Sequence, residues 1–242
     1  MKLLIDIGNS RLKWGYFTHN ALRSDYLDHQ EDQYLIILEN SWKQLADDPE
    51  WLILSCVGRK EIEKSVTNLA ERVWPEVKIL SVKTTQKSHG VVNGYRRPER
   101  LGVDRWLALI AAHNLYQQAV CIVDLGTAIT MDWMNESGRH LGGVICPGLA
   151  IMKQSVNKNT ANLPMVDYEF SDAIADNTEA AIYSGTLCAA IGLINYLYKK
   201  NSTNSKLILT GGDAQLIAPF IEFEHVVEPH LIFYGLALMI ED

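Results

Sequence analysis

Two short turns, each an aspartate followed two residues later by glycine, are the parts of this 242-residue sequence best suited to chemistry. Residues 6–8 (DIG) and 124–126 (DLG) each follow one apolar run and precede another. In such a hairpin, glycine lets backbone N–H groups approach phosphate oxygens, and the carboxylate can hold Mg²⁺ directly or through water. A single copy is also typical of an ordinary turn. The two copies together favour a pair of hairpins that bind a nucleoside triphosphate from both sides.

The two turns belong to a longer internal repeat. Residues 4–10 (LIDIGNS) align with 122–128 (IVDLGTA), and residues 52–55 (LILS) resemble 207–210 (LILT) further along each half. Chance similarity of strand–turn–strand pieces is the alternative, but the shared order favours two similar α/β halves. We expect an N-terminal lobe over residues 1–105 and a C-terminal lobe over residues 106–242.

A third chemical candidate is the sequence GVDR at residues 102–105, which follows a long polar segment and begins an apolar helix. Asp104 in the first turn could simply interact favourably with the helix dipole, and Arg105 could form an ion pair with an acidic residue at the surface. Alternatively, Asp104 could accept the proton of a hydroxyl that attacks phosphorus, and Arg105 could bind an anionic group of the substrate. The spacing alone leaves both interpretations open.

Alternating strand and helix patterns must position these residues. Apolar runs predict strands, and apolar residues recurring every three or four positions predict helices. The expected strands cover residues 3–7, 51–56, 77–82, 120–125, 129–134, 142–148 and 206–210, with a further strand through Leu12, Trp14 and Tyr16. The expected helices cover residues 60–73, 103–117, 178–199 and 234–240. Residues 84–102 should form a long loop, which is often functional. The alternation favours a layered α/β fold.

Composition excludes several classes of protein. Hydrophobic residues make up 48% and charged residues 21% of the chain, which is typical of a globular protein. The net charge of −7 disfavours binding to nucleic acid, which needs a basic surface. The chain also contains no GxxxxGK[ST], GxGxxG or GxSxG motif, so the P-loop, the dinucleotide fingerprint and the hydrolase elbow are not expected.

One stretch, residues 180–198, carries no formal charge and could be considered a membrane helix. It contains asparagine, serine, threonine and three tyrosines, so we interpret it as a buried helix or a subunit interface. The N-terminus reaches Asp6 after a short apolar run and lacks a signal-peptide core. We therefore expect a cytoplasmic protein that is not bound to a membrane.

The set of motifs resembles the type III pantothenate kinases, a family of the actin-like ATPase superfamily. The resemblance is carried, in chain order, by DIGNS, GVDR, DLGTAIT, GGVICPG, TANLP, NTEAAIYSG and LTGGDA, and it covers effectively the whole chain. It implies two similar ribonuclease-H-like or actin-like lobes with mixed sheets flanked by helices. It also implies ATP-dependent phosphorylation of pantothenate at its primary hydroxyl, the first step of coenzyme A biosynthesis.

The resemblance also implies residue roles. Asp104 would be the general base, and Asp6 would lie near Mg²⁺. Asp124 would bind the monovalent cation, K⁺ or NH₄⁺, that this family requires. The expected ATP contacts are Asp6, Ile7, Gly8, Asn9, Ser10, Arg11, Leu12, Lys13 and Thr127. The expected pantothenate contacts are Tyr95, Gly102, Val103, Asp104, Arg105 and Thr178, the last from the partner subunit of a homodimer.

Two other functions fit the same fold. A phosphohydrolase would use Asp104 to activate water, and it would need no organic acceptor. A regulatory protein would bind the nucleotide and release no ADP when pantothenate is added.

Overall fold

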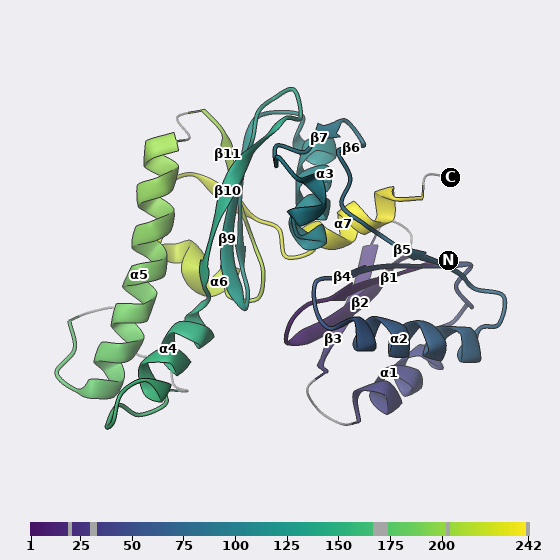
Figure 1. Cartoon of the computed structure of the whole chain (residues 1–242), viewed down its shortest axis with the longest axis horizontal. Helices are drawn as coiled ribbons and strands as arrows, with labels where there is room; N and C mark the ends of the chain where they lie inside the picture. The colour runs from purple at the N-terminus through teal and green to yellow at the C-terminus, as the bar shows by residue number, and fades with distance from the viewer. Residues whose placement is uncertain (19–20, 30–32, 167–173, 202–203, 241–242) are drawn as a thin grey trace. The chain divides into compact units, whose positions relative to one another are not determined.

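The computed structural model describes residues 1–18, 21–29, 33–166, 174–201 and 204–240. They form two compact units (Figure 1). Unit 1 combines residues 1–115 with the C-terminal segment 230–242, and unit 2 comprises residues 116–229. Each unit is built around its own five-stranded sheet.

The sheet of unit 1 has the strand order β3-β2-β1-β4-β5. Its strands are β1 (Lys2–Ile7), β2 (Arg11–Thr18), β3 (Ala21–Asp28), β4 (Trp51–Cys56) and β5 (Lys78–Ser81). The pairs β1–β2 and β2–β3 are antiparallel, whereas β1–β4 and β4–β5 are parallel. The central strands β1 and β4 are almost continuously apolar because both faces of the sheet are covered.

Helices cover both faces of this sheet. The elements outside the sheet are α1 (Tyr34–Trp42), α2 (Lys60–Val73), β6 (Lys87–Ser88), β7 (Val91–Val92), the 3₁₀ turn η1 (Pro98–Arg100), α3 (Val103–Tyr116) and α7 (Leu231–Leu238). Helices α1 and α2 share one hydrophobic core with β1, β2 and β4, and Figure 1 shows both on the same side of the sheet. Residues of α3 and α7 form a second core with Leu4 of β1 and Ile53 of β4.

The sheet of unit 2 has the order β10-β9-β8-β11-β12. Its strands are β8 (Val120–Leu125), β9 (Ala128–Met134), β10 (His140–Pro147), β11 (Lys206–Thr210) and β12 (His225–Val227). Its helical elements are α4 (Leu149–Lys158), α5 (Thr178–Asn201), α6 (Ala214–Ile217) and the 3₁₀ turn η2 (Ala218–Phe220). Figure 1 shows α4, α5 and α6 on one side of this sheet.

The two sheets have the same topology, which confirms the repeat seen in the sequence. In each, two antiparallel pairings join the first three strands, and two parallel pairings join the first, fourth and fifth. The equivalence extends to single residues, because Asp6 is paired in register with Ser55 and Asp124 with Thr210. The expected fold class, two similar α/β halves with mixed sheets flanked by helices, is therefore confirmed.

The division into units differs from the boundary expected between residues 105 and 106. That boundary falls inside α3, a continuous helix that packs in the core of unit 1. The C-terminal helix α7 also belongs to unit 1, because it packs on β1 and β4. The repeat located the two halves, but it could not show that the last helix of the chain returns to the first half.

Helix α5 is long and apolar enough to cross a membrane by length and composition alone. One side of it, however, contributes Tyr183, Leu187, Ala190, Ile194 and Tyr198 to the core of unit 2. The expectation of a buried helix is therefore met on that side. Its other side includes exposed residues such as Cys188 and Tyr196.

Candidate active site

The turn between β1 and β2 is held from three directions. Gly8 N donates a 2.9 Å hydrogen bond to Arg11 O across the turn. The ring nitrogen Nε2 of buried His29 donates to Gly8 O at 2.9 Å. The segment after β4 lies so close that a Cβ placed on Gly58 would be 2.6 Å from Gly8 O. The conformation of this candidate phosphate-binding turn is therefore fixed by its neighbours.

The residues expected to contact ATP differ in what they expose. Ile7 and Leu12 are fully buried in the core of unit 1, so neither residue is exposed to a ligand in this structure. Gly8 and Ser10 are half-buried and Asn9 is exposed, as a binding turn requires. The Arg11 guanidinium lies 5.0 Å from the ring centre of Tyr26 on β3, a cation–π contact.

Asp6 is a buried carboxyl group with a raised pKa. It lies at the end of β1, 7% exposed, and its Oδ1 accepts a 2.8 Å hydrogen bond from Ser55 Oγ on β4. The pKa of Asp6 is raised to about 6: burial is the largest cause and the nearby Asp104 carboxylate adds to it, whereas Lys13 and the Ser55 hydrogen bond lower the pKa. A buried acid with such a pKa beside a second carboxylate is typical of functional sites.

The sequence GVDR lies where α3 begins. Asp104 Oδ1 accepts a 2.8 Å hydrogen bond from Arg105 N in the first turn. A Cβ on Gly102 would be 2.5 Å from the same oxygen, so a larger residue there would move the Asp104 carboxylate. Arg105 is 6% exposed, and its Nη1 donates to Tyr95 Oη at 2.9 Å. The structure thus brings together Asp6, Lys13 and Asp104, and it also joins Tyr95 to Arg105.

In unit 2, the equivalent hairpin around Asp124 is closely approached by two glycines, Gly148 and Gly211. Gly211 follows β11 with φ of +92°, and a Cβ on it would meet the Asp124 carboxylate and lie 2.5 Å from Leu125 O. Gly148 N donates to Thr127 O at 3.0 Å, and a Cβ on Gly148 would collide with Gly126 O. Glycine at these positions lets three chain segments converge on one turn, with Thr127 exposed at its tip.

The remaining expected residue, Thr178, is exposed at the start of α5, where Asn177 Oδ1 accepts a hydrogen bond from Ala180 N at 2.9 Å and caps the helix.

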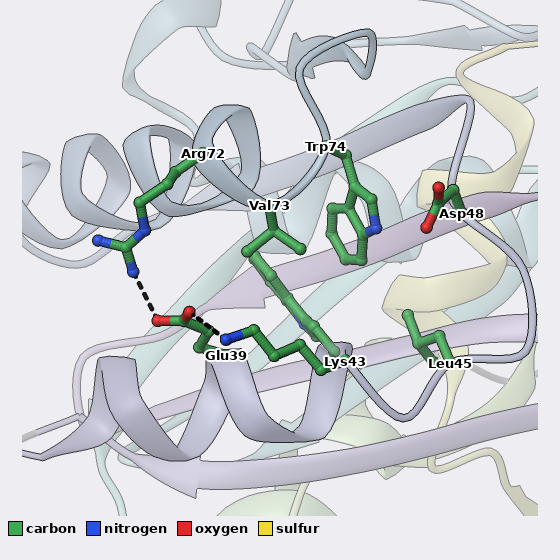
Figure 2. Close-up of a pocket in the computed structure, with 8 residues that line it drawn as sticks. Glu39, Lys43, Leu45, Asp48, Arg72, Val73 and Trp74 are labelled. Carbon is green, nitrogen blue, oxygen red and sulfur yellow. Dashed lines mark hydrogen bonds and ion pairs between the residues drawn. The ribbon is translucent and has the colours of Figure 1, made fainter.

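A pocket on unit 1 is lined by residues around the ends of α1 and α2. Figure 2 shows Glu39 there between Lys43 and Arg72, with ion pairs of 2.7 and 2.6 Å. None of the residues expected to do chemistry lines this pocket.

Comparison with known proteins decides the family. The model for the type III pantothenate kinase family matches residues 2–200. A type III pantothenate kinase of Nitrosococcus oceani is 32% identical over 258 aligned positions, covering 100% of this chain and 94% of its own length. The chain belongs to the type III pantothenate kinase family.

Solved structures support the same fold. A Campylobacter jejuni protein assigned to the Baf family of transcriptional activators superposes with a TM-score of 0.62 at 24% identity, covering 98% of this chain and 96% of its own. The activator of the 2-hydroxyisocaproyl-CoA dehydratase from Clostridium difficile, with bound ADPNP, has a TM-score of 0.57 at 13% identity, with 98% and 93% coverage. At these identities the likeness shows the fold alone.

The side chains present fit the cations that the pantothenate kinase family implies. Asp6 is a buried carboxylate beside Asp104, and carboxylate oxygens are the usual protein ligands of Mg²⁺. Around Asp124, the close approach of Gly211 to a carboxylate and a carbonyl oxygen forms a small oxygen-rich cradle, the ligand type that K⁺ prefers. Within the described residues, no cluster of three or more His, Cys, Asp or Glu side chains forms a further metal-binding group.

Sequence reasoning missed several residues that support this site. Ser55 was aligned with Thr210 in the repeat, but its hydrogen bond to Asp6 was not anticipated. His29 and Gly58 hold the first turn without belonging to any recognised motif. The motifs containing Gly148 and Gly211 were recognised, and the structure adds the reason that glycine stands there.

Proposed function

We propose that this chain transfers the γ-phosphoryl group of ATP to the primary hydroxyl of pantothenate, with Asp104 as the general base. Membership of the type III pantothenate kinase family over the whole chain supports the reaction, which begins coenzyme A biosynthesis. The observation that carries the residue assignment is the electrostatic proximity of Asp104 to Asp6 within unit 1. A base beside the carboxylate that faces the phosphates is what this transfer needs.

In the proposed mechanism, the protein acts mainly by positioning ATP and pantothenate for the transfer. The turn after β1 presents backbone N–H groups to the phosphates, and Lys13, paired in register with Asp6, adds positive charge. Asp6 would hold Mg²⁺, which when bound neutralises charge on the phosphates. Asp104 accepts the hydroxyl proton as the oxygen attacks, so the pantothenate alkoxide never has to form free in solution.

The substrate contacts follow from the start of α3 and the loop before it. Arg105 suits the pantothenate carboxylate because a guanidinium pairs with carboxylates in a fixed geometry. Tyr95, which accepts a hydrogen bond from Arg105, would contact pantothenate beside it, and Gly102 and Val103 would contribute backbone groups to this pantothenate pocket. Thr178 reaches the pocket from the partner subunit.

The second hairpin has a different role from the first. Asp124 holds the monovalent cation, K⁺ or NH₄⁺, and Thr127 contacts ATP. The exposed position of Thr127 and the oxygen-rich surroundings of Asp124 support this division.

The enzyme acts as a homodimer through the exposed side of α5, and its need for ATP supports a cytoplasmic location. Cell fractionation and light scattering test these two points.

ADP release measured with and without pantothenate tests the function. We expect release only when pantothenate and Mg²⁺ are both present, and faster with K⁺ or NH₄⁺ than with Na⁺. ADP release without pantothenate would instead favour a phosphohydrolase. Nucleotide binding without ADP release under any of these conditions would favour a regulatory protein.

A further inference from the structure

Asn93 is a buried polar residue in a segment that is otherwise largely at the surface. It lies in the loop of residues 84–102 with an exposed fraction of 3%. A polar side chain at such a position needs hydrogen-bond partners, since an unpaired buried amide is costly. The partners of Asn93 define what the residue does.

The side-chain amide of Asn93 uses all of its hydrogen-bonding groups. Nδ2 donates to Thr85 O at 3.3 Å and to Pro98 O at 3.2 Å, and Oδ1 accepts from Tyr95 N at 2.9 Å. An asparagine amide has two N–H donors and one carbonyl oxygen, so no N–H remains for a substrate. Every partner is a backbone group, and the three lie in different parts of the same loop.

The backbone of Asn93 is held as well. Asn93 N donates to Gln86 O at 2.9 Å, and Asn93 O accepts from Gln86 Nε2 at 3.1 Å. The loop ends are further tied by a 2.9 Å hydrogen bond from Thr84 Oγ1 to Leu101 O, one residue before Gly102. Asn93 is therefore the internal connection between the start of the loop, its middle and the turn η1 that leads into GVDR.

Tyr95 connects the hydrogen-bonded loop around Asn93 to the start of α3. Its backbone is fixed by Asn93, while its hydroxyl accepts from Arg105 Nη1 at 2.9 Å. The Arg105 guanidinium also lies 5.6 Å from the centre of the Tyr95 ring. Arg105 is buried, so a shift of Tyr95 would change the surroundings of the guanidinium directly.

We propose that Asn93 is a positioning residue for pantothenate: it fixes Tyr95, and through Tyr95 the Arg105 guanidinium, in the geometry that binds the substrate. This inference rests on the proposed function, in which Tyr95 and Arg105 contact pantothenate. Asn93 acts without touching the substrate, because its amide N–H groups are already used within the loop. Its loss should weaken pantothenate binding and leave ATP binding, which uses the β1–β2 turn, unaffected.

Steady-state kinetics of Asn93→Ala tests the inference. We expect KM for pantothenate to rise by about tenfold or more, because small misplacements of binding groups have large effects, while KM for ATP stays within about twofold. Asn93→Ser, which keeps a smaller hydrogen-bonding group, should fall between wild type and Asn93→Ala, and it serves if the alanine variant does not fold. Equal KM values for pantothenate in wild type and both variants would overturn the inference.

Asn114→Ala is the matched control. Its side chain donates to His89 O at 3.3 Å and Ile110 O at 2.9 Å, so it ties the β6–β7 turn to α3 without touching Tyr95. KM for pantothenate should stay within about twofold of wild type in this variant, as for surface changes in general. A rise equal to that of Asn93→Ala would mean that any loosening of the loop suffices, which contradicts a specific role for Asn93.

A double-mutant cycle with Tyr95→Phe tests the route through Tyr95. If Asn93 acts through Tyr95, the two changes in KM for pantothenate should not be additive. Fully additive effects would overturn that route. Amide hydrogen exchange gives a readout that needs no activity: Tyr95 N–H should be protected in wild type and exchange faster in Asn93→Ala.

These measurements separate the two claims. A wild-type protein without pantothenate-dependent ADP release would overturn the proposed function, and the inference with it. An active wild type whose Asn93→Ala variant loses Tyr95 protection but keeps its KM for pantothenate would overturn the inference alone.

Discussion

Ser55 Oγ donates a 2.8 Å hydrogen bond to Asp6 Oδ1, and it does so from the residue paired with Asp6 across the parallel strands β1 and β4. The same register in unit 2 pairs Asp124 with Thr210, so both halves place a hydroxyl residue beside the carboxylate at the strand end. In unit 1 this hydrogen bond only partly offsets burial, which raises the pKa of Asp6 to about 6. The protein thus keeps a carboxylate in a place where its ionisation is unfavourable.

Asp6→Asn should therefore make the protein more stable above pH 7 while it removes activity. The folded-state pKa of about 6 lies above the ordinary aspartate value of 3.8, so the contribution of protonated Asp6 to stability is present below pH 4 and lost as pH rises through 6. At pH 8 the substitution should raise the free energy of unfolding by about 1–3 kcal/mol, from 1.36 kcal/mol per pKa unit. Urea denaturation at pH 8 and pH 4 measures the difference, which should vanish at pH 4.

The control for this prediction is Asp47→Asn, which alters an exposed carboxylate in the same unit. Its effect on the free energy of unfolding should stay within about 0.5 kcal/mol at either pH. Destabilisation of Asp6→Asn at pH 8 would contradict the account of Asp6.

Ser55→Ala should shift the pH dependence of the enzyme. The Ser55 hydrogen bond lowers the pKa of Asp6, so its loss raises that pKa further. Asp6 must be ionised to act on the phosphates. The pH dependence of kcat/KM for Mg-ATP reports the pKa values of groups in the free enzyme. The acid limb of that profile should move to higher pH in Ser55→Ala and return towards wild type in Ser55→Thr. Identical profiles for all three proteins would argue against the role of the hydroxyl.

Gly211→Ala should be strongly destabilising, and Gly142→Ala much less so. Both glycines have positive φ, +92° and +119°, but only the added Cβ at 211 would meet the Asp124 carboxylate and Leu125 O. Backbone strain costs about 1–3 kcal/mol at either site, and the collision adds to it only at Gly211. Thermal unfolding of the two variants measures the difference. The K⁺ concentration for half-maximal activity should also rise in Gly211→Ala, and similar behaviour of both variants would contradict the cradle around Asp124.

Subunit complementation tests the position of Thr178. If each active site combines Asp104 of one chain with Thr178 of its partner, a heterodimer of Asp104→Asn and Thr178→Ala chains contains one intact site. Co-expression in equal amounts should restore about a quarter of wild-type activity, because half of randomly formed twofold dimers are mixed. Purification of the mixed dimer through two different tags sharpens the measurement. No recovery in that dimer would place Thr178 and Asp104 in the same chain's site, and full activity of the Thr178→Ala homodimer would place Thr178 outside the site.

The sequence predicted the elements whose patterns are regular. The bounds of α2 (Lys60–Val73) match the expectation, because Ile62, Val66 and Leu69 recur on one face of the helix. In contrast, β3 (Ala21–Asp28) was not anticipated: it is an edge strand with mostly exposed residues, so no alternation marks it. Helix α7 begins three residues earlier than expected, at Leu231.

The candidate site divides in the same way. Asp6 and Asp124 could be proposed because the repeat aligns them, and Asp104 because GVDR belongs to the set of motifs that carries the family resemblance. The supporting residues could not be found, since the roles of Asn93 and His29 depend on burial and on partners distant in sequence. The pairing of Ser55 with Asp6 depends on the register of β1 and β4, which could be inferred only after the sheets were known.

The assignment of Asp104 as general base of a pantothenate kinase is the central claim, and one measurement tests it most directly. Single-turnover phosphorylation of pantothenate should be slower by about 100-fold or more in Asp104→Asn, the typical contribution of a general base. ATP affinity measured by calorimetry should stay close to that of wild type. An Asp104→Asn enzyme that phosphorylates pantothenate at the wild-type rate, or a wild-type enzyme that forms no phosphorylated pantothenate, would contradict the claim.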